Sequence, residues 1–290
     1  MLKNILVTGG SGFIGSHVVD HLIKKKYSVT VIDLIKPKRK DVKFIKSSIL
    51  NKKLIRLALK KNKIIFHLAA VSDINKVKDI PIETIETNIL GTTLLLDEGR
   101  KANIKRFIFA STYYSYRDAG NLYTTSKIAS ESIIKNYSFL YGLKYTILRY
   151  PTAYGPRNRQ VDAISIFVKH ALKNSNLIIH GNGNQERNYL HVEDLGEASV
   201  AAINKKLINK TITLISSKNI KIINLAKKII KLAESKSKIV FNKQKKRLDD
   251  FTSATLNIKK KYIFHEWKPK NNLDSGLLKY IKYIKSNTIK

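Results

Sequence analysis

The sequence predicts an α/β fold, a doubly wound parallel sheet with helices on both faces, followed by a smaller α+β lobe. A glycine-rich stretch, residues 8–15, stands between an apolar run and a helical pattern near the start of the chain. Apolar runs of strand length then alternate with helical patterns as far as Tyr150, which is typical of a parallel sheet. Beyond Tyr150 the elements are shorter and are separated by proline and glycine, which indicates a less regular second lobe.

Composition narrows the class of protein. A chain of 290 residues can bury a large core, and the absence of cysteine excludes disulfides and thiolate metal sites. No apolar run reaches about 18 residues, so we expect a cytoplasmic protein with no membrane partner. The net charge of +34 is spread along the whole chain, with no zinc-finger or RNA-recognition signature. We therefore do not expect nucleic acid as a partner, although the charge would attract anionic substrates.

The glycine stretch has the spacing of a dinucleotide-binding turn. Gly9, Gly12 and Gly15 are three residues apart, and Phe13 and Ile14 begin the helix that follows. Without a Cβ the chain can turn tightly and bring backbone N–H groups against a pyrophosphate, at the positive end of the helix. The turn therefore predicts a nucleotide cofactor.

The next expected strand, 27–32, is followed by Asp33, eighteen residues past Gly15. A carboxylate at this point accepts both hydroxyls of the adenosine ribose and repels a 2′-phosphate. The sequence therefore favours NAD over NADP.

Further elements follow from hydrophobic periodicity. Ser48 and Ile49 follow the third strand and are expected near the adenine, while Leu68, Ala69 and Ala70 close the fourth with little bulk, which leaves room for a ligand. In the first lobe we expect strands at 3–7, 27–32, 43–45, 64–70, 106–110 and 145–148, and helices ending at 23 and spanning 54–59, 81–99 and 123–141. In the second part we expect helices at 164–172, 191–203, 220–233 and 273–284, and strands at 211–215 and 238–241.

Tyr123 and Lys127 are four residues apart at the start of a helix, so their side chains share a face. Lowering a tyrosine pKa from about 10 to near 7 requires about 4 kcal/mol. An ammonium about 5 Å away supplies roughly 3 kcal/mol at an effective dielectric near 20, and the positive ring of oxidised nicotinamide can supply the rest. With Thr112 at the end of the fifth strand, the pair predicts a site for dehydrogenating an alcohol.

These motifs together resemble the extended short-chain dehydrogenase/reductase family, and within it the NAD-dependent sugar-nucleotide epimerases and dehydratases that resemble UDP-glucose 4-epimerase. The resemblance covers essentially the whole chain and is carried by residues 8–15, Asp33, 67–70, Asn88 with 91–92, 111–112, 123–127, 149–150, 154–157, 181–194, Arg247, Asp250, 267–269 and 276–277.

The resemblance implies a Rossmann-type NAD-binding domain over residues 1–150, onto which 188–207 pack back, and a substrate-binding lobe formed mainly by 151–290. It implies that Thr112, Tyr123 and Lys127 are catalytic and that a homodimer forms through helices 88–100 and 123–141. The implied cofactor contacts are Gly9, Gly12, Phe13, Ile14, Gly15, Asp33, Ser48, Ile49, Leu68, Ala69, Ala70, Asn88, Tyr123, Lys127 and Tyr150. The implied substrate contacts are Thr112, Thr152, Arg187, Arg247 and Asp250, the two arginines holding the diphosphate, since a guanidinium fits phosphate oxygens.

Three departures bear on the reaction. The dehydratases of this family carry acidic residues just after the threonine, where this chain has Tyr113 and Tyr114, which argues against a 4,6-dehydratase. Thr152 replaces a usual asparagine, and Ser48 replaces a usual aspartate. No metal is expected, because His17 and His21 have no acidic third ligand beside them.

The leading hypothesis is a sugar-nucleotide 4-epimerase, with UDP-sugars favoured, acting through transient oxidation at C4 to a 4-keto intermediate. One alternative on the same fold is a nucleotide-sugar dehydrogenase or 4-keto reductase with net redox turnover. An alternative of another class is a catalytically silent nucleic-acid-binding or regulatory protein on the same fold.

Overall fold

The computed structural model describes residues 4–74, 76–116, 121–158, 162–242, 258 and 263–288. The chain divides into two compact units. The first comprises Met1–Tyr150, Gly196–Leu214 and Lys259–Phe264, and the second comprises Pro151–Leu195, Ile215–Ile258 and His265–Lys290.

A seven-stranded, all-parallel sheet forms the centre of the first unit, in the order β11-β6-β5-β4-β1-β2-β3. The order reverses between β1 and β4, and ligands bind at the carboxyl ends of strands at such a switch point. The strands are β1 (Asn4–Thr8), β2 (Ser28–Asp33), β3 (Lys43–Lys46), β4 (Ile64–His67), β5 (Arg106–Thr112), β6 (Tyr145–Tyr150) and β11 (Lys210–Thr213).

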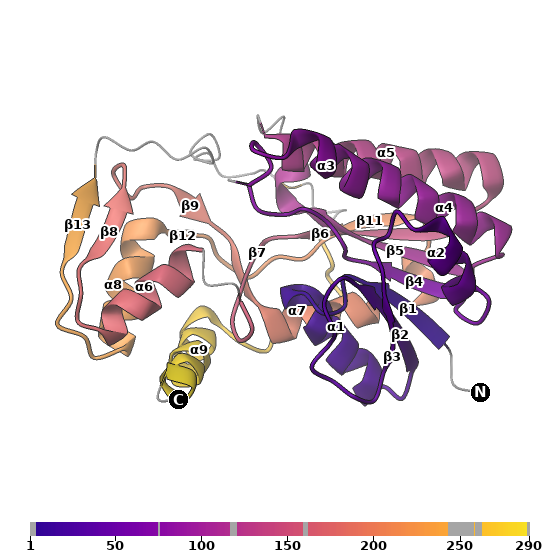
Figure 1. Cartoon of the computed structure of the whole chain (residues 1–290). Helices are drawn as coiled ribbons and strands as arrows, with labels where there is room; N and C mark the ends of the chain where they lie inside the picture. The colour runs from indigo at the N-terminus through magenta and orange to yellow at the C-terminus, as the bar shows by residue number, and fades with distance from the viewer. Residues whose placement is uncertain are drawn as a thin grey trace. The chain divides into compact units, whose positions relative to one another are not determined.

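Helices cover both faces of this sheet, as Figure 1 shows for the first unit. α2 (Lys52–Leu59), α3 (Pro81–Ile85), α4 (Gly91–Lys101) and α5 (Leu122–Tyr141) lie on one face, and α1 (Phe13–Lys24) lies on the other. Apolar residues from α2, α4, α5 and the strands form one buried cluster beneath the first group of helices. The predicted α/β, doubly wound fold is confirmed.

The predicted continuous helix 81–99 is wrong in one respect. A π-helical turn, η1 (Glu86–Leu90), separates α3 from α4, and the Gly91 N–H donates to the Glu86 carbonyl five residues back. A Cβ on Gly91 would lie 2.6 Å from Ile49 Cδ1, so this glycine lets the helix lie against the core. Such π turns occur frequently at functional sites, and hydrophobic periodicity does not reveal them.

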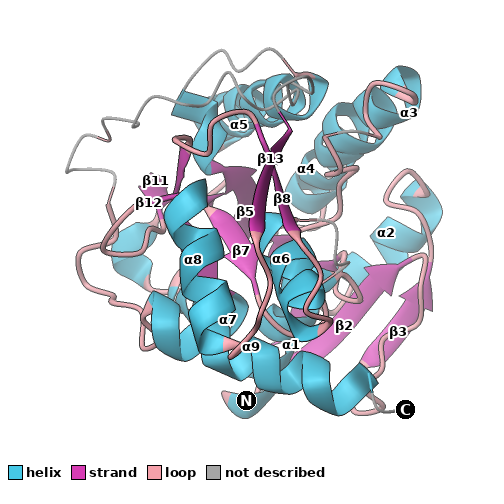
Figure 2. Cartoon of the chain, turned by 90° about the vertical axis from the view of Figure 1, so that its left-hand side faces the viewer, coloured by secondary structure: helices cyan, strands magenta, loops and turns pink. Residues whose placement is uncertain are grey.

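The second unit is built from short strands and helices around its own apolar core (Figure 2). Its strands are β7 (Thr152–Tyr154), β8 (Leu177–His180), β9 (Glu186–Arg187), β10 (Tyr189–His191), β12 (Ile220–Lys221) and β13 (Ile239–Asn242). They pair only two by two in the described residues: β10 with β7 and β13 with β8 in parallel, and β12 with β9 antiparallel. Its main helices are α6 (Ala163–Leu172), α8 (Ile222–Leu232) and α9 (Leu273–Thr288).

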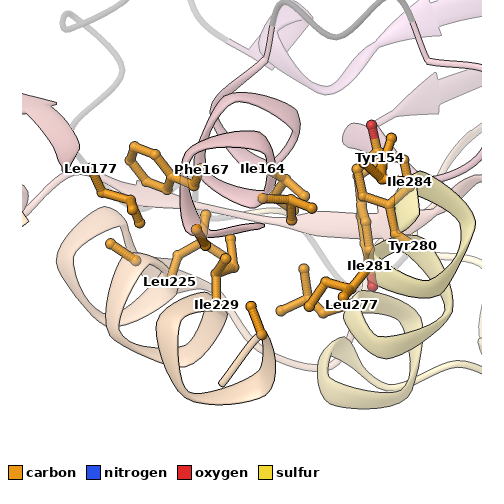
Figure 3. Packing of buried hydrophobic residues seen from close by; sticks show 14 of the residues in the cluster. Tyr154, Ile164, Phe167, Leu177, Leu225, Ile229, Leu277, Tyr280, Ile281 and Ile284 are labelled. Carbon is orange, nitrogen blue, oxygen red and sulfur yellow. The ribbon is translucent and has the colours of Figure 1, made fainter. Parts of the chain in front are cut away.

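Figure 3 shows the packing of this core, in which side chains of α6, α8 and α9 meet. Leu225, Ile229 and Leu277 are fully buried there. α7 (Val192–Ala201) begins in the second unit and ends in the first, followed by the short 3₁₀ helix η3 (Lys205–Leu207).

The predicted helix 191–203 begins one residue later than expected, because His191 is the last residue of β10 and pairs with Tyr154. A three-residue strand leaves no alternation long enough to read in the sequence. Among the described residues, none of the helices combines the length and the apolar character needed to cross a membrane.

Candidate active site

The glycine turn joins β1 to α1 at the switch point of the sheet. Gly9 has φ +72°, and a Cβ there would lie 2.6 Å from the Ala69 nitrogen. A Cβ on Gly15 would lie 2.0 Å from the Gly9 carbonyl oxygen. The turn therefore accepts no side chain at either position, and the backbone of Leu68 and Ala69, which directly follow β4, packs against Gly9.

α1 begins at Phe13 directly after this turn. Gly12 is its N-cap, and within the described residues no side chain caps the helix there. The first N–H groups of a helix need an acceptor and carry a positive partial charge. Phe13, Ile14 and the turn thus present what a dinucleotide pyrophosphate requires.

Asp33, the last residue of β2, has its carboxylate held by two backbone donors. Oδ2 accepts from the Ser11 N–H at 2.9 Å, and Oδ1 accepts from the Ile35 N–H at 3.1 Å. These bonds orient the carboxylate next to the glycine turn, and each oxygen keeps a further lone pair for a ribose hydroxyl. The residues fit NAD.

Arg39 is the arginine nearest to Asp33 in the sequence, and a cofactor with a 2′-phosphate would need a guanidinium such as this one to bind it. It is instead engaged by two carboxylates: Nη1 donates to Asp20 at 2.8 Å, and Nε donates to Asp41 at 2.8 Å. These hydrogen bonds raise the pKa of the Arg39 guanidinium above its ordinary value. This arrangement agrees with a preference for the cofactor that lacks the phosphate.

The residues expected around the adenine and nicotinamide differ in their surroundings. Leu68 donates its N–H to the Thr8 carbonyl at 3.0 Å, which places residues 68–70 beside the glycine turn. The Ser48 hydroxyl accepts from the Leu50 N–H at 3.1 Å. Ile49 is 4% exposed and belongs to the apolar core, so a cofactor contact from this residue would come from its backbone.

Tyr123 and Lys127 stand on the first two turns of α5. Asn121 caps this helix by accepting the Thr124 N–H at 2.9 Å, a local reason for the helix to start here. Lys127 Nζ lies 5.9 Å from the centre of the Tyr123 ring and 4.6 Å from the centre of the Phe109 ring. It also donates to the Ala110 carbonyl at 2.8 Å, which ties the helix to the end of β5.

Burial changes the pKa of both groups. It raises the pKa of Tyr123 to about 12 and lowers the pKa of Lys127 to about 7, an effect that the Glu131 carboxylate opposes. The expected lowering of the Tyr123 pKa relies on the Lys127 ammonium together with the positive nicotinamide ring; in the protein alone, burial sets the direction of both pKa shifts. Desolvation favours the neutral form of each group.

Thr112 ends β5, where it pairs in register with Tyr150 of β6. Its hydroxyl oxygen accepts from the Tyr114 N–H at 3.2 Å, which leaves the hydroxyl its own proton to donate. The Tyr150 hydroxyl lies 2.8 Å from Ser199 Oγ, and burial raises the Tyr150 pKa. The polar end of Tyr150 is thus occupied by α7.

Asn88 lies in the π turn and is 2% exposed. Its side chain accepts from the Val71 N–H at 2.8 Å and donates to the Val71 carbonyl at 3.0 Å and to Ser126 Oγ at 2.9 Å. All its side-chain hydrogen-bonding groups are used within the protein. Asn88 therefore fixes the loop after β4 to α5.

Sequence reasoning missed a buried ion pair next to this site. Glu131 accepts two hydrogen bonds from Arg149, at 2.9 and 2.6 Å, and one from Ser111 Oγ at 2.5 Å. The Arg149 guanidinium also lies 4.3 Å from the centre of the Tyr116 ring. The signal in the sequence was a carboxylate four residues after Lys127, on the same helix face.

Apart from Thr112, the substrate residues expected from the resemblance belong to the second unit or are not described. Thr152 lies in β7 and donates its N–H to the Asn188 carbonyl at 3.1 Å. Arg187 lies in β9, is 9% exposed, and donates to the Glu186 carbonyl at 3.0 Å. Arg247 and Asp250 lie outside the described residues.

The described residues contain no group of three histidine, aspartate or glutamate side chains arranged to hold a metal ion. The chemistry visible in the first unit is instead a phenol, an ammonium and a hydroxyl at the carboxyl edge of a sheet, beside a glycine turn that fits a dinucleotide.

Comparison with known proteins gives a consistent result. The model of the NAD dependent epimerase/dehydratase family matches residues 5–214. A putative UDP-glucose 4-epimerase of Methanocaldococcus jannaschii is 31% identical over 98% of this chain and 99% of its own length. A UDP-N-acetyl-alpha-D-glucosaminuronate decarboxylase of Bacillus cytotoxicus is 35% identical over 83% of each chain.

A solved structure shows the same likeness. The UDP-glucose 4-epimerase of Thermotoga maritima, solved with UDP-glucose, aligns with a TM-score of 0.91 and 29% identity, covering 99% of this chain and 100% of that one. The glycine turn, the oriented Asp33 carboxylate and these matches lead to one conclusion: the chain belongs to the NAD-dependent epimerase/dehydratase family, whose members act on sugar nucleotides.

Proposed function

We propose that this protein is a sugar-nucleotide 4-epimerase that takes a UDP-sugar as substrate and uses Tyr123, Lys127 and Thr112 at the reacting C4 carbon. One observation carries the proposal: α5 and β5 bring these three groups to the same sheet edge as the glycine turn and Asp33. A cofactor in that turn and a catalytic phenol would thus be held by one unit.

When bound, NAD supplies the acceptor and donor of hydride for oxidation and re-reduction at C4. The protein's part is proton transfer. Tyr123 as phenolate would take the proton of the C4 hydroxyl and later return it, while Thr112 donates a hydrogen bond to the same oxygen.

The raised pKa of Tyr123 makes its positive surroundings essential to this role. In the described chain the pKa is about 12, so an uncompensated phenol would rarely be ionised at neutral pH. The Lys127 ammonium, together with the positive ring of the oxidised cofactor, would stabilise the phenolate. The Ala110 carbonyl and Glu131 in turn favour the charged form of Lys127.

The residues after Thr112 support epimerisation over dehydration. Elimination of water needs an acid and a base on the sugar, and Tyr113 and Tyr114 supply neither at neutral pH. Tyr113 is 9% exposed, and its ring packs edge-on against Tyr114 at 5.8 Å. The relatives include a decarboxylase, so the test must separate these reactions.

The test incubates the purified protein and NAD with UDP-glucose, UDP-N-acetylglucosamine and UDP-glucuronate, followed by proton NMR of the sugars. Inversion at C4 with the nucleotide intact and no steady change in nicotinamide absorbance is expected. Release of carbon dioxide, loss of the C6 hydroxyl, or net formation of NADH would contradict the proposal and identify the reaction that takes its place.

We also propose that the protein is a homodimer that pairs through the expected helices 88–100 (η1 and α4) and 123–141 (α5), together with α3. Phe139 at the end of α5 is 88% exposed, and Ile82 on α3 is 69% exposed. Leu140 and Tyr141 on α5, Ile85 on α3 and Leu90 on η1 add further exposed apolar surface. Analytical ultracentrifugation of the two proteins tests this. We expect the wild type to sediment as a dimer and Phe139→Glu as a monomer.

A further inference from the structure

His67 is a buried titratable residue to which the proposed mechanism gives no role. It ends β4, is 1% exposed, and lies between the rings of Phe107 and Phe109, whose centres are 5.8 and 5.6 Å away. Both ring nitrogens nevertheless have partners: Nδ1 lies 2.7 Å from Thr8 Oγ1, and Nε2 lies 2.9 Å from Thr92 Oγ1.

The partners fix which nitrogen carries the proton. Thr92 Oγ1 lies 2.6 Å from the Asn88 carbonyl, which can only accept, so the single hydroxyl proton of Thr92 is used there. Thr92 must then accept from His67, which places the ring proton on Nε2. Burial and the nearby Lys127 ammonium lower the His67 pKa, so the ring is neutral and Nδ1 accepts the Thr8 hydroxyl proton.

These bonds continue beyond Asn88 to the catalytic helix. The Asn88 side-chain amide donates to Ser126 Oγ at 2.9 Å, and Ser126 Oγ donates to the Tyr123 carbonyl at 2.7 Å. Ser130 Oγ donates to the Asn88 carbonyl at 2.9 Å. The protons of Thr8, His67, Thr92, the Asn88 amide and Ser126 therefore point in one direction, from the residue before Gly9 to the first turn of α5, whereas Ser130 donates back from α5 to Asn88.

We propose that His67 is a positioning residue whose hydrogen bonds couple the glycine turn to the helix that carries Tyr123 and Lys127. We name the chain of hydrogen bonds through Thr8, His67, Thr92, Asn88 and Ser126 the histidine relay. Thr8 leads directly into the turn and Ser126 directly precedes Lys127, so the relay connects the place for the cofactor with the proton-transfer groups. Its catalytic consequence rests on the proposed function.

The first arm of the test observes His67 directly and needs no activity. Nitrogen-15 NMR of the histidine rings in the cofactor-free protein should show one neutral ring with its proton on Nε2, unchanged between pH 6 and 8. A His67 ring protonated on Nδ1, or one that titrates in this range, would overturn the relay.

The second arm measures coupling by hydrogen exchange at the Lys127 amide, with the Leu22 amide in α1 as reference. Thr8→Val and Thr92→Val each break one link and keep the side-chain shape. Each should speed exchange at Lys127 relative to Leu22 by about tenfold, and the double variant should show the same factor, because either break interrupts the relay. Two results would show that no relay exists. One is equal acceleration of exchange at the Lys127 and Leu22 amides, and the other is an acceleration in the double variant equal to the product of those in the two single variants.

Matched controls lie beside each substitution. Thr93 makes the same kind of bond as Thr92, from Oγ1 to the Ile89 carbonyl at 2.9 Å, and Thr30 is a buried strand threonine like Thr8. Thr93→Val and Thr30→Val should change the exchange rate of the Lys127 amide relative to that of the Leu22 amide by less than twofold.

The third arm is kinetic. kcat should fall about tenfold in Thr8→Val, Thr92→Val and the double variant, with KM for the sugar nucleotide unchanged, because misplacement of the base affects only the chemical step. A fall in kcat in Thr93→Val and Thr30→Val as large as in the relay variants would contradict the proposal. If the wild type turns over no nucleotide sugar, the proposed function fails, while the NMR and exchange arms still decide on the relay.

Discussion

His67 in the first unit and His191 in the second are both 1% exposed, but their surroundings differ. His67 has a hydrogen-bond partner on each nitrogen. Among the described residues, neither nitrogen of His191 has one; its nearest carboxylate is Glu193, 3.7 Å away. Burial lowers the pKa of both rings, so both are neutral near pH 7.

The same contrast extends to the units. The first unit buries a connected polar network along the edge where β1, β4 and β5 end, and this network places chemical groups. In the second unit His191 instead lies against Tyr154, a member of the apolar cluster to which α6, α8 and α9 contribute. The difference teaches that burial of a titratable residue indicates function only when its partners also define a geometry.

The largest expected effect contrasts two buried tyrosines. Tyr123→Phe should lower kcat by about 10²–10⁴, the usual contribution of a general base, and leave NAD bound. Tyr154→Phe in the second unit should leave kcat within about threefold, because the Tyr154 ring packs against Tyr189 and His191. Initial rates and the NAD content of the purified variants measure both. Near-normal turnover in Tyr123→Phe would show that the base is another group.

Two glycines without room for a Cβ extend the comparison. A Cβ on Gly15 would meet the Gly9 carbonyl oxygen at 2.0 Å, and one on Gly276 would meet the Tyr154 hydroxyl at 2.1 Å. Both alanine variants should lose about 3 kcal/mol or more of unfolding free energy, as overpacked buried sites do. Only Gly15→Ala should also lose NAD affinity, measured by calorimetry well below the melting temperature. Equal NAD affinity in both variants would refute the assignment of the glycine turn as the binding site of the NAD pyrophosphate.

A smaller effect concerns the pH dependence of stability. The pKa of Lys127 is about 7 in the folded chain against 10.5 ordinarily, so between pH 7 and 10 the unfolded state binds more protons. The contribution of Lys127 to the unfolding free energy should therefore rise with pH, by at most about 1.4 kcal/mol per unit. Urea titrations of wild type and Lys127→Met at pH 7, 8 and 9 should show the unfolding free energy of the wild type rising relative to that of the variant as pH increases. A difference that stays constant would mean that Lys127 is not desolvated.

The smallest effect is expected at His191. His191→Phe removes two nitrogens that have no hydrogen-bond partner among the described residues and keeps a flat ring beside Tyr154, so unfolding free energy should change by less than about 1 kcal/mol. His67→Phe should cost more, because it removes the acceptor of the Thr8 hydroxyl proton and the donor to Thr92 Oγ1. Denaturant midpoints compare the two, and an equal cost would remove the distinction between the units.

Much of the first unit follows from local sequence. The alternation of apolar strands and amphipathic helices predicted six of the seven strands of its sheet within a few residues, and 211–215 predicted the seventh. Glycine spacing predicted the turn, since a missing Cβ matters wherever the backbone packs that closely. In the second unit, the prediction of a strand at 238–241 is confirmed by β13, whereas β7, β9, β10 and β12 did not follow, because two or three residues carry no readable period.

The sequence by itself determined the order of elements, the glycine turn, the acidic residue after β2 and the spacing of Tyr123 and Lys127. The tertiary structure decided which polar groups meet: Thr8 and His67 are 59 residues apart, and Asn88 and Ser126 are 38 apart. It also decided that Tyr123 and Lys127 are both desolvated, which raises the pKa of Tyr123 and lowers that of Lys127. A residue's periodicity reports which face it occupies, whereas its hydrogen bonds and pKa depend on neighbours that only folding brings together.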